Sequence, residues 1–150
     1  MKILEANNGA LTNFEVLDFL RAKGASKDPT RVLAKVTQSE YKVYDYLFDT
    51  AARDQTSESI NEFLKSVKSH DLAKAEILNI INMRPSNIVE IFPIIEYCDT
   101  RFSDEELTEI VENVKRTFPP PPEESKPEDA NSAEETKSSG EEGGEQMDAS

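Results

Sequence analysis

The chain has one histidine, His70, and one cysteine, Cys98, the residue types that most often act as bases, nucleophiles or metal ligands. His70 lies between Ser69 and Asp71 at a predicted helix junction, and the chain has no second histidine to share a metal. We therefore interpret it as a surface or helix-end residue. Cys98 has no histidine or cysteine near it in sequence and is interpreted as a partly buried apolar residue.

Three consecutive carboxylates, Asp104, Glu105 and Glu106, could be considered for acid–base chemistry. They begin a predicted helix, however, where negative charge complements the helix dipole. The five glycines lie in turns and in the C-terminal segment, and they form no phosphate-binding loop. The sequence therefore predicts no catalytic residue, no cofactor and no metal site, and it favours a protein that works by binding.

Five basic residues fall within twenty residues of an otherwise acidic chain: Lys65, Lys68, His70, Lys74 and Arg84. Lys65 and Lys68 are spaced to share one helix face. One interpretation of the set is a weak contact with RNA or with an acidic protein surface. The other is that these side chains simply solvate the faces of two helices, and the sequence leaves both open.

The charge of the chain is unevenly distributed. Its 30 acidic and 17 basic residues give a net charge of −13, and residues 119–150 alone hold ten acidic and two basic residues. This balance argues against a general nucleic-acid-binding surface, which needs clustered lysine and arginine. A single cysteine cannot form an internal disulfide, so we expect a reducing compartment, nuclear or cytosolic. We find no signal peptide or membrane-spanning run and expect no membrane association.

Hydrophobic periodicity and capping signals predict an all-α fold of about six helices preceded by a short apolar arm, residues 2–6. Thr12 and Glu15 fit a capping box, and Gly24 suits the end of the first helix. Asp71 is expected to cap the fourth helix, which ends at Arg84 because a proline follows. The other predicted helices are near residues 13–23, 39–52, 57–69, 86–92 and 103–117.

Thr37 and Ser103 begin two further capping-box patterns. After Thr37, aromatic and apolar residues recur at helical spacing: Tyr41, Tyr44, Leu47, Phe48 and Ala51. Such a stripe could be a base-stacking platform or a core-packing face. We favour core packing, because stacking platforms are set among basic residues and this segment contains one lysine.

Four consecutive prolines, residues 119–122, end the predicted helical body. Residues 123–150 contain no aromatic residue and few apolar ones, which is typical of a disordered segment. We therefore divide the chain into a helical domain, 1–118, and a proline-led acidic tail, 119–150. The tail is either a solubility and spacing element or a docking strip for a basic partner.

Two blocks of the sequence match a known family in their order and spacing. The first is GALTNFEVLDFL, residues 9–20, and the second is KSHDLAKAEILNIINMRPSNIVEI, residues 68–91, followed by DEEL at residues 104–107. Together they resemble the small stalk subunit of RNA polymerase III. That family is related to the fourth subunit of RNA polymerase II and to the archaeal F subunit, and in animals it is also called calcitonin-gene-related-peptide receptor component protein.

The resemblance implies an HRDC-like helical domain and an obligate heterodimer with a larger stalk subunit that carries an S1-like OB barrel. It also implies a nuclear protein that joins the polymerase core, supports initiation factors in the transcription of small RNAs such as tRNA and 5S rRNA, and lies near nascent RNA. In this family the N-terminal arm and first helix pack on the partner. The implied interface residues are Ile3, Leu4, Leu11, Phe14, Val16 and Leu17.

Two other functions remain open from the sequence. The animal family name suggests a membrane-associated signalling adaptor, although no lipidation motif or basic amphipathic helix supports it. A freestanding helical RNA-binding module is the second, because HRDC-type folds can bind nucleic acid.

Overall fold

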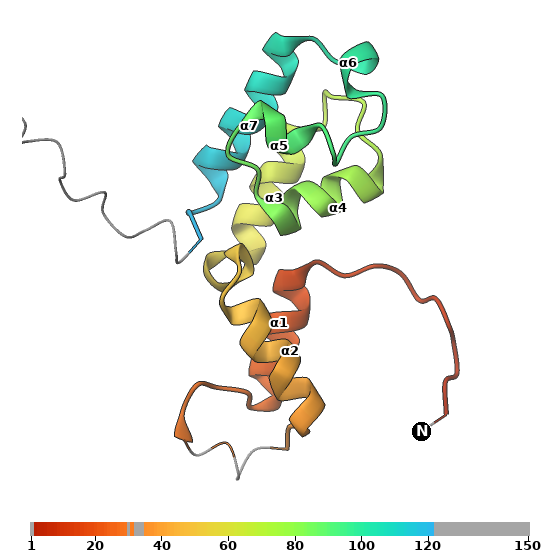
Figure 1. The fold of residues 1–150 in the computed structure, drawn as a ribbon. Helices are drawn as coiled ribbons and strands as arrows, with labels where there is room; N and C mark the ends of the chain where they lie inside the picture. The colour runs from red at the N-terminus through yellow and green to blue at the C-terminus, as the bar shows by residue number, and fades with distance from the viewer. Residues whose placement is uncertain (1, 30, 32–34, 122–150) are drawn as a thin grey trace, which may run out of the picture.

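The computed structural model describes residues 2–29, 31 and 35–121, and every regular element in this part of the chain is helical (Figure 1). The prediction of an all-α protein is therefore confirmed. The described elements are α1 (Asn13–Lys23), α2 (Gln38–Phe48), the 3-10 helix η2 (Ala51–Asp54), α3 (Ser57–Ser66), α4 (Lys74–Met83), α5 (Ile88–Ile91), α6 (Cys98–Arg101) and α7 (Asp104–Thr117).

Helix α1 has the limits that its local sequence predicts. The Thr12 hydroxyl accepts a hydrogen bond from the Glu15 amide at 3.2 Å, and the Glu15 carboxylate accepts one from the Thr12 amide at 2.6 Å. At the other end, Gly24 adopts a φ of 109°, a left-handed conformation that favours glycine. The predicted capping boxes at Thr37 and Ser103 are present as well, at the starts of α2 and α7.

Other helix ends differ from the prediction. Helix α2 stops at Phe48, and the chain continues as the separate 3-10 turn η2 instead of remaining helical to residue 52. Helix α3 ends at Ser66 rather than at 69, and α5 is a single turn. Short 3-10 turns commonly connect helices in this way, because they tighten the chain where the α-helical pattern ends.

The predicted cap of helix α4 is wrong. Ala73, not Asp71, occupies the N-cap position, and the helix begins at Lys74. The Ala73 amide donates a 2.8 Å hydrogen bond to the carboxylate of Glu76. This carboxylate is fixed by Arg101, which is 25 positions further along the chain. A contact over that sequence distance leaves no trace in the local pattern on which the prediction rested.

The buried side chains form two clusters, and their helices lie in two groups, α1 with α2 and α3 with α4 to α7 (Figure 1). The first cluster joins α1, α2 and η2, and its core residues are Phe14, Leu17, Leu20, Ala25, Tyr44, Leu47 and Ala52. The second joins α3 to α7 and is larger. Ile60 on α3 is half-buried and packs against both clusters. Burial of Tyr44 and Leu47 confirms that the aromatic stripe of α2 packs in the core.

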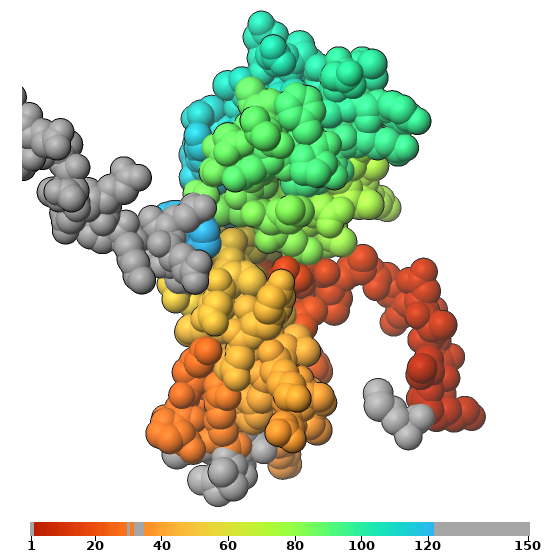
Figure 2. Space-filling model, viewed as in Figure 1, coloured from red at the N-terminus to blue at the C-terminus, as the bar shows by residue number. Residues whose placement is uncertain are grey.

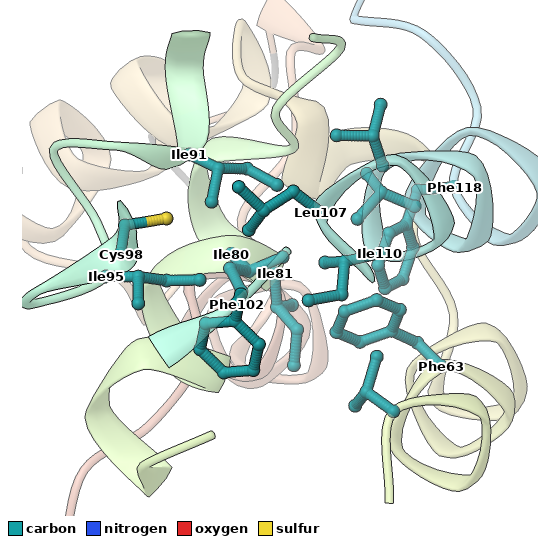
Figure 3. Close-up of a cluster of buried hydrophobic side chains, with 13 residues drawn as sticks. Phe63, Ile80, Ile81, Ile91, Ile95, Cys98, Phe102, Leu107, Ile110 and Phe118 are labelled. Atoms are coloured by element: carbon teal, nitrogen blue, oxygen red, sulfur yellow. The ribbon is translucent and has the colours of Figure 1, made fainter. Parts of the chain in front are cut away.

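The second cluster closes around the last residue of the helical body (Figure 3). The ring of Phe118, directly after α7, lies 5.3 Å from the ring of Phe63 on α3. Ile110 of α7 lies beside this pair, and Cys98 is buried at the opposite side of the cluster. The chain is thus fixed to α3 just before the four prolines. The disorder prediction concerns residues 123–150, which lie outside the described part of the chain.

Candidate protein-interaction surface

The N-terminal arm carries large apolar side chains that the rest of the chain does not cover. Ile3 is 75% exposed, Leu4 is 89% exposed and Leu11, just before α1, is 60% exposed. Figure 2 shows the arm standing away from the two packed clusters. Exposed apolar side chains that gather on one segment mark an interaction site more often than single exposed ones do. Three of the six residues expected at a partner interface are therefore available to a partner.

The structure places two of those six residues elsewhere. Phe14 is 8% exposed and Leu17 is fully buried, and both pack in the first cluster against α2. Val16 is half-buried against the same cluster. Because a core-facing stripe and a partner-facing stripe have the same apolar pattern, the sequence could not distinguish them. In this conformation the residues of the set that remain accessible are Ile3, Leu4, Leu11 and part of Val16.

A groove of about 240 Å³ lies at the base of the arm and was not anticipated from the sequence. Its walls come from the start of α1 on one side and from α3 and α4 on the other. The lining residues are Ala10, Thr12, Glu15, Ile60, Leu64, Lys74, Ile77, Leu78 and Ile81. Most of these side chains are apolar. The groove thus extends the apolar surface of the arm toward the junction of the two clusters.

The five basic residues considered for contact with RNA or an acidic partner are not all exposed. Lys65, Lys68 and Lys74 are exposed. The His70 side chain, by contrast, is only 5% exposed, and its Nε2 atom lies 3.5 Å from a carboxylate oxygen of Glu109 on α7. His70 therefore sits at the predicted junction but is mostly covered by its neighbours.

Arg84 does not belong to a surface patch. It is buried, ends α4 in a left-handed conformation with φ of 46°, and donates from Nε and Nη2 to the carbonyl oxygen of Phe118 at 3.2 and 3.1 Å. Its guanidinium thereby satisfies a carbonyl at the end of α7, where helix carbonyls lack partners within the helix. Within the described part of the chain, Arg84 thus joins the end of α4 to the end of α7.

Glu76, a buried carboxylate in the first turn of α4, is held by several donors. It accepts hydrogen bonds from Arg101 Nη1 at 2.6 Å and from the backbone amides of Ala73 and Glu96. The bond from Arg101, followed by these backbone donors, holds the pKa of the Glu76 carboxyl below its usual range, although burial opposes the shift. The pair joins α4 to α6 and explains why a carboxylate is tolerated in this position.

Cys98 is buried, as its sequence context predicts, and burial raises the pKa of its thiol. A raised pKa keeps the sulfur in the less reactive thiol form. Among the described residues, no group of three or more His, Cys, Asp or Glu side chains could hold a metal ion. The described helices also include none that is long and apolar enough to span a membrane.

Over the described residues, these features define a helical module with an uncovered apolar arm. Comparison with known proteins identifies the family. The sequence matches the family described as RNA polymerase Rpb4 over residues 10–118, and the chain belongs to this family.

Relatives within the family carry more specific names. The chain is 30% identical over 131 residues to "DNA-directed RNA polymerase III subunit rpc9" of Schizosaccharomyces pombe, an alignment that covers 79% of this chain and 100% of the relative. It is 35% identical over 122 residues to the rpc9 subunit of Dictyostelium discoideum, covering 75% and 89%. The RPC9 subunit of Saccharomyces cerevisiae is 28% identical over 158 residues, covering 75% and 96%. Each relative is named as a subunit of RNA polymerase III.

Proposed function

We propose that this chain is a non-catalytic subunit of RNA polymerase III and that it works in the nucleus. It forms a heterodimer with the larger stalk subunit that carries an S1-like OB barrel, and the pair joins the polymerase core. There it supports initiation factors in the transcription of small RNAs such as tRNA and 5S rRNA. Membership of the RNA polymerase Rpb4 family and the names of the three relatives support this assignment.

The exposed apolar arm is the observation that supports the heterodimer proposal. Ile3, Leu4 and Leu11 belong to neither hydrophobic cluster, so the described part of the chain does not bury them. Burying one such side chain against a partner would stabilise a complex by about 1.5–3 kcal/mol. Removing two of them from a dimer interface is therefore expected to weaken it by several orders of magnitude, while the fold of the chain is left intact.

Co-expression with the S1-type stalk subunit tests this proposal. The double variant Ile3→Asp/Leu4→Asp should lose copurification at moderate salt, and its thermal unfolding should match that of the wild type. Val89→Asp is the matched control, because Val89 is 74% exposed on α5, outside the arm and the groove, and it should copurify normally. If the wild-type chain fails to copurify, or if the arm variant copurifies as well as the control, the heterodimer proposal is wrong.

The proposed contact with nascent RNA or with an acidic protein surface now rests on fewer residues. Lys65, Lys68 and Lys74 are exposed and can reach a polyanion, and His70 can do so only through its small exposed part. Arg84 is withdrawn from this set, since its guanidinium is buried against Phe118. Lysine ammonium groups of this kind contact phosphates or carboxylates through charge, so the proposed contact is sequence-independent and salt-sensitive.

A further inference from the structure

The groove at the base of the N-terminal arm is not filled by the two clusters that it adjoins. Its volume is about 240 Å³. Two of its lining residues, Leu64 on α3 and Leu78 on α4, belong to neither cluster, and Leu64 is 40% exposed. A cavity of about 150 Å³ with apolar walls can bind benzene. The groove therefore has room for aliphatic side chains that do not come from its own walls.

The arm, residues 2–6, supplies side chains of that kind. Ile3 and Leu4 are adjacent and almost fully exposed, and Figure 2 shows the arm standing away from both clusters. Leu4 is six positions before Ala10, which is itself a lining residue of the groove. Six extended residues span about 20 Å, so the arm is long enough to return to the groove.

The segment between the arm and Ala10 is suited to a reversal of the chain. Asn7, Asn8 and Gly9 are residue types that favour turns, and all three are exposed. Gly9 adopts a φ of 103°, and a β-carbon there would have nothing within 4 Å. The Gly9 amide donates to the Asn7 side-chain carbonyl at 3.4 Å. A change of backbone angles in this segment would therefore turn the arm without displacing a packed side chain.

The groove has a charge at each end. Lys74 is the first residue of α4, and Ile81 lines the groove two turns further along the helix, roughly 10 Å away. The Asn13 amide donates to the side-chain carbonyl of Asn82, the neighbour of Ile81, at 2.8 Å. This bond places the first turn of α1, with the exposed carboxylate of Glu15, at the end of α4 that is opposite to Lys74.

The arm carries the complementary pattern of charges. Lys2 and Glu5 flank its two apolar residues and are three positions apart, which is about 10 Å in an extended chain. This distance is close to the separation of the charged ends of the groove. With Glu5 beside Lys74 and Lys2 toward Glu15, each charge meets one of the opposite sign. An arm that ran in the other direction would bring like charges together.

We propose that, in the free chain, the arm closes over the groove as a strap. It reverses at residues 7–9, lays its two apolar side chains on Leu64 and places Glu5 beside Lys74; the structure shows the open arm. Because the strap is part of the same chain, its effective concentration at its own groove is on the order of millimolar, which exceeds that of a second copy in dilute solution. Ordering the arm offsets most of the apolar burial, so the open and closed states are both populated and closure changes the overall stability little.

The closed strap hides two apolar surfaces at once, the arm and the groove. A partner must open it to reach either surface, so the arm acts as an intramolecular competitor that suppresses weak, nonspecific association. The closure follows from the residues of this chain and does not depend on the assignment to RNA polymerase III.

Engineered disulfide formation in the full-length chain tests the closure. In oxidised glutathione, Leu4→Cys/Leu64→Cys should form an intramolecular disulfide about tenfold faster, or more, than Leu4→Cys/Val89→Cys, because the bond needs two β-carbons within about 4.5 Å. Val89 is the matched control site, since it is 74% exposed on α5 and lies outside the groove. Both variants keep Cys98, which is buried.

Two results of this experiment would overturn the proposal. The first is an intramolecular rate no faster than that of the control pair. The second is a disulfide-linked dimer whose formation rises with protein concentration, because the arm would then occupy the groove of a second copy.

The direction of the arm in the groove has its own measurement. Adding Glu5→Lys to the Leu4→Cys/Leu64→Cys chain should slow the intramolecular reaction about threefold at low salt, and adding Lys74→Glu as well should restore the rate. Asp18→Lys is the matched control, because Asp18 is an exposed acid of α1 outside the groove, and it should leave the rate unchanged. A rate that does not respond to Glu5→Lys, or that Lys74→Glu does not restore, would show that the closed state is not the one proposed.

The disulfide-locked strap also measures competition with a partner, a step that rests on the proposed heterodimer. The oxidised Leu4→Cys/Leu64→Cys chain should copurify with the S1-type stalk subunit about tenfold less than the same chain after reduction. Equal recovery of the two forms would show that the strap does not compete with the partner. If the wild-type chain also fails to copurify, the heterodimer proposal is wrong, and the disulfide rates alone decide the closure.

Discussion

Among the partly exposed side chains of the helical body, we expect removal of Arg101 to lower the free energy of unfolding most. Its guanidinium donates to both carboxylate oxygens of Glu76, at 2.6 and 3.2 Å. It also donates to the backbone carbonyls of Glu96 at 2.9 Å and of Asp71 at 2.7 Å. One side chain thereby connects the segment before α4, the segment before α6 and the start of α4 itself. Arg101→Ala removes all four contacts at once.

The expected loss follows from the burial of the two partners. A hydrogen bond to a charged group contributes about 1.5–3 kcal/mol. The Arg101 side chain is 31% exposed, so water screens part of the ion pair. Glu76 keeps two backbone donors after the substitution, and the freed carbonyls can bind water. We therefore expect Arg101→Ala to lower the free energy of unfolding by about 2 kcal/mol, which corresponds to a fall in Tm of roughly 8 °C.

Chemical denaturation of the full-length chain, followed by far-ultraviolet circular dichroism, measures this loss. The matched control is Lys115→Ala, because Lys115 forms a wider, more exposed pair with Glu112 at 3.8 Å. Its substitution should change the free energy of unfolding by less than about 0.5 kcal/mol. In an Arg101→Ala background, Glu76→Gln should cost much less than it does in the wild type, since their shared contact is already gone. A loss of less than about 0.5 kcal/mol for Arg101→Ala would refute the role assigned to this pair.

Two further predictions concern the same side of the molecule. The folded-state pKa of Glu76 is lowered, so its contribution to stability is present at neutral pH and is lost as the pH falls through that lowered value. The Tm of Glu76→Gln should therefore fall less than that of the wild type between about pH 6 and about pH 3. Tyr97 is 71% exposed and adopts a left-handed φ of 52°. Tyr97→Gly should raise the free energy of unfolding by about 1 kcal/mol, because glycine relieves this strain, and an unchanged or lower value in urea denaturation would contradict that reason.

Features set by a few neighbouring residues could be predicted from the sequence. The limits of α1 follow from Thr12, Glu15 and Gly24, all within the helix or next to it. The start of α7 follows from Ser103 and Glu106 in the same way. Each of these hydrogen bonds joins residues no more than four positions apart, so the pattern that encodes it is visible in a short window.

Features that depend on long-range contacts could not be predicted. The start of α4 depends on where Arg101 holds the Glu76 carboxylate. The burial of Arg84 depends on where α7 ends, 34 positions later. The family resemblance implied Phe14 at a partner interface, but in the structure it packs in the first cluster against α2. In each case a tertiary contact, and not the local sequence pattern, determines the role of the residue.

Among the described residues, the contacts that join the two hydrophobic clusters include a shared side chain and two hydrogen bonds. Ile60 packs against both, the Asn13 amide donates to the side-chain carbonyl of Asn82 at 2.8 Å, and the Gln55 side-chain amide donates to the carbonyl of Ile81 at 2.8 Å. The groove at the base of the arm lies at this junction and is lined from both sides. A partner that buries the arm and enters the groove would add apolar contacts at this junction. We therefore expect heterodimer formation to stabilise the packing of the two clusters against each other more than the packing within either one.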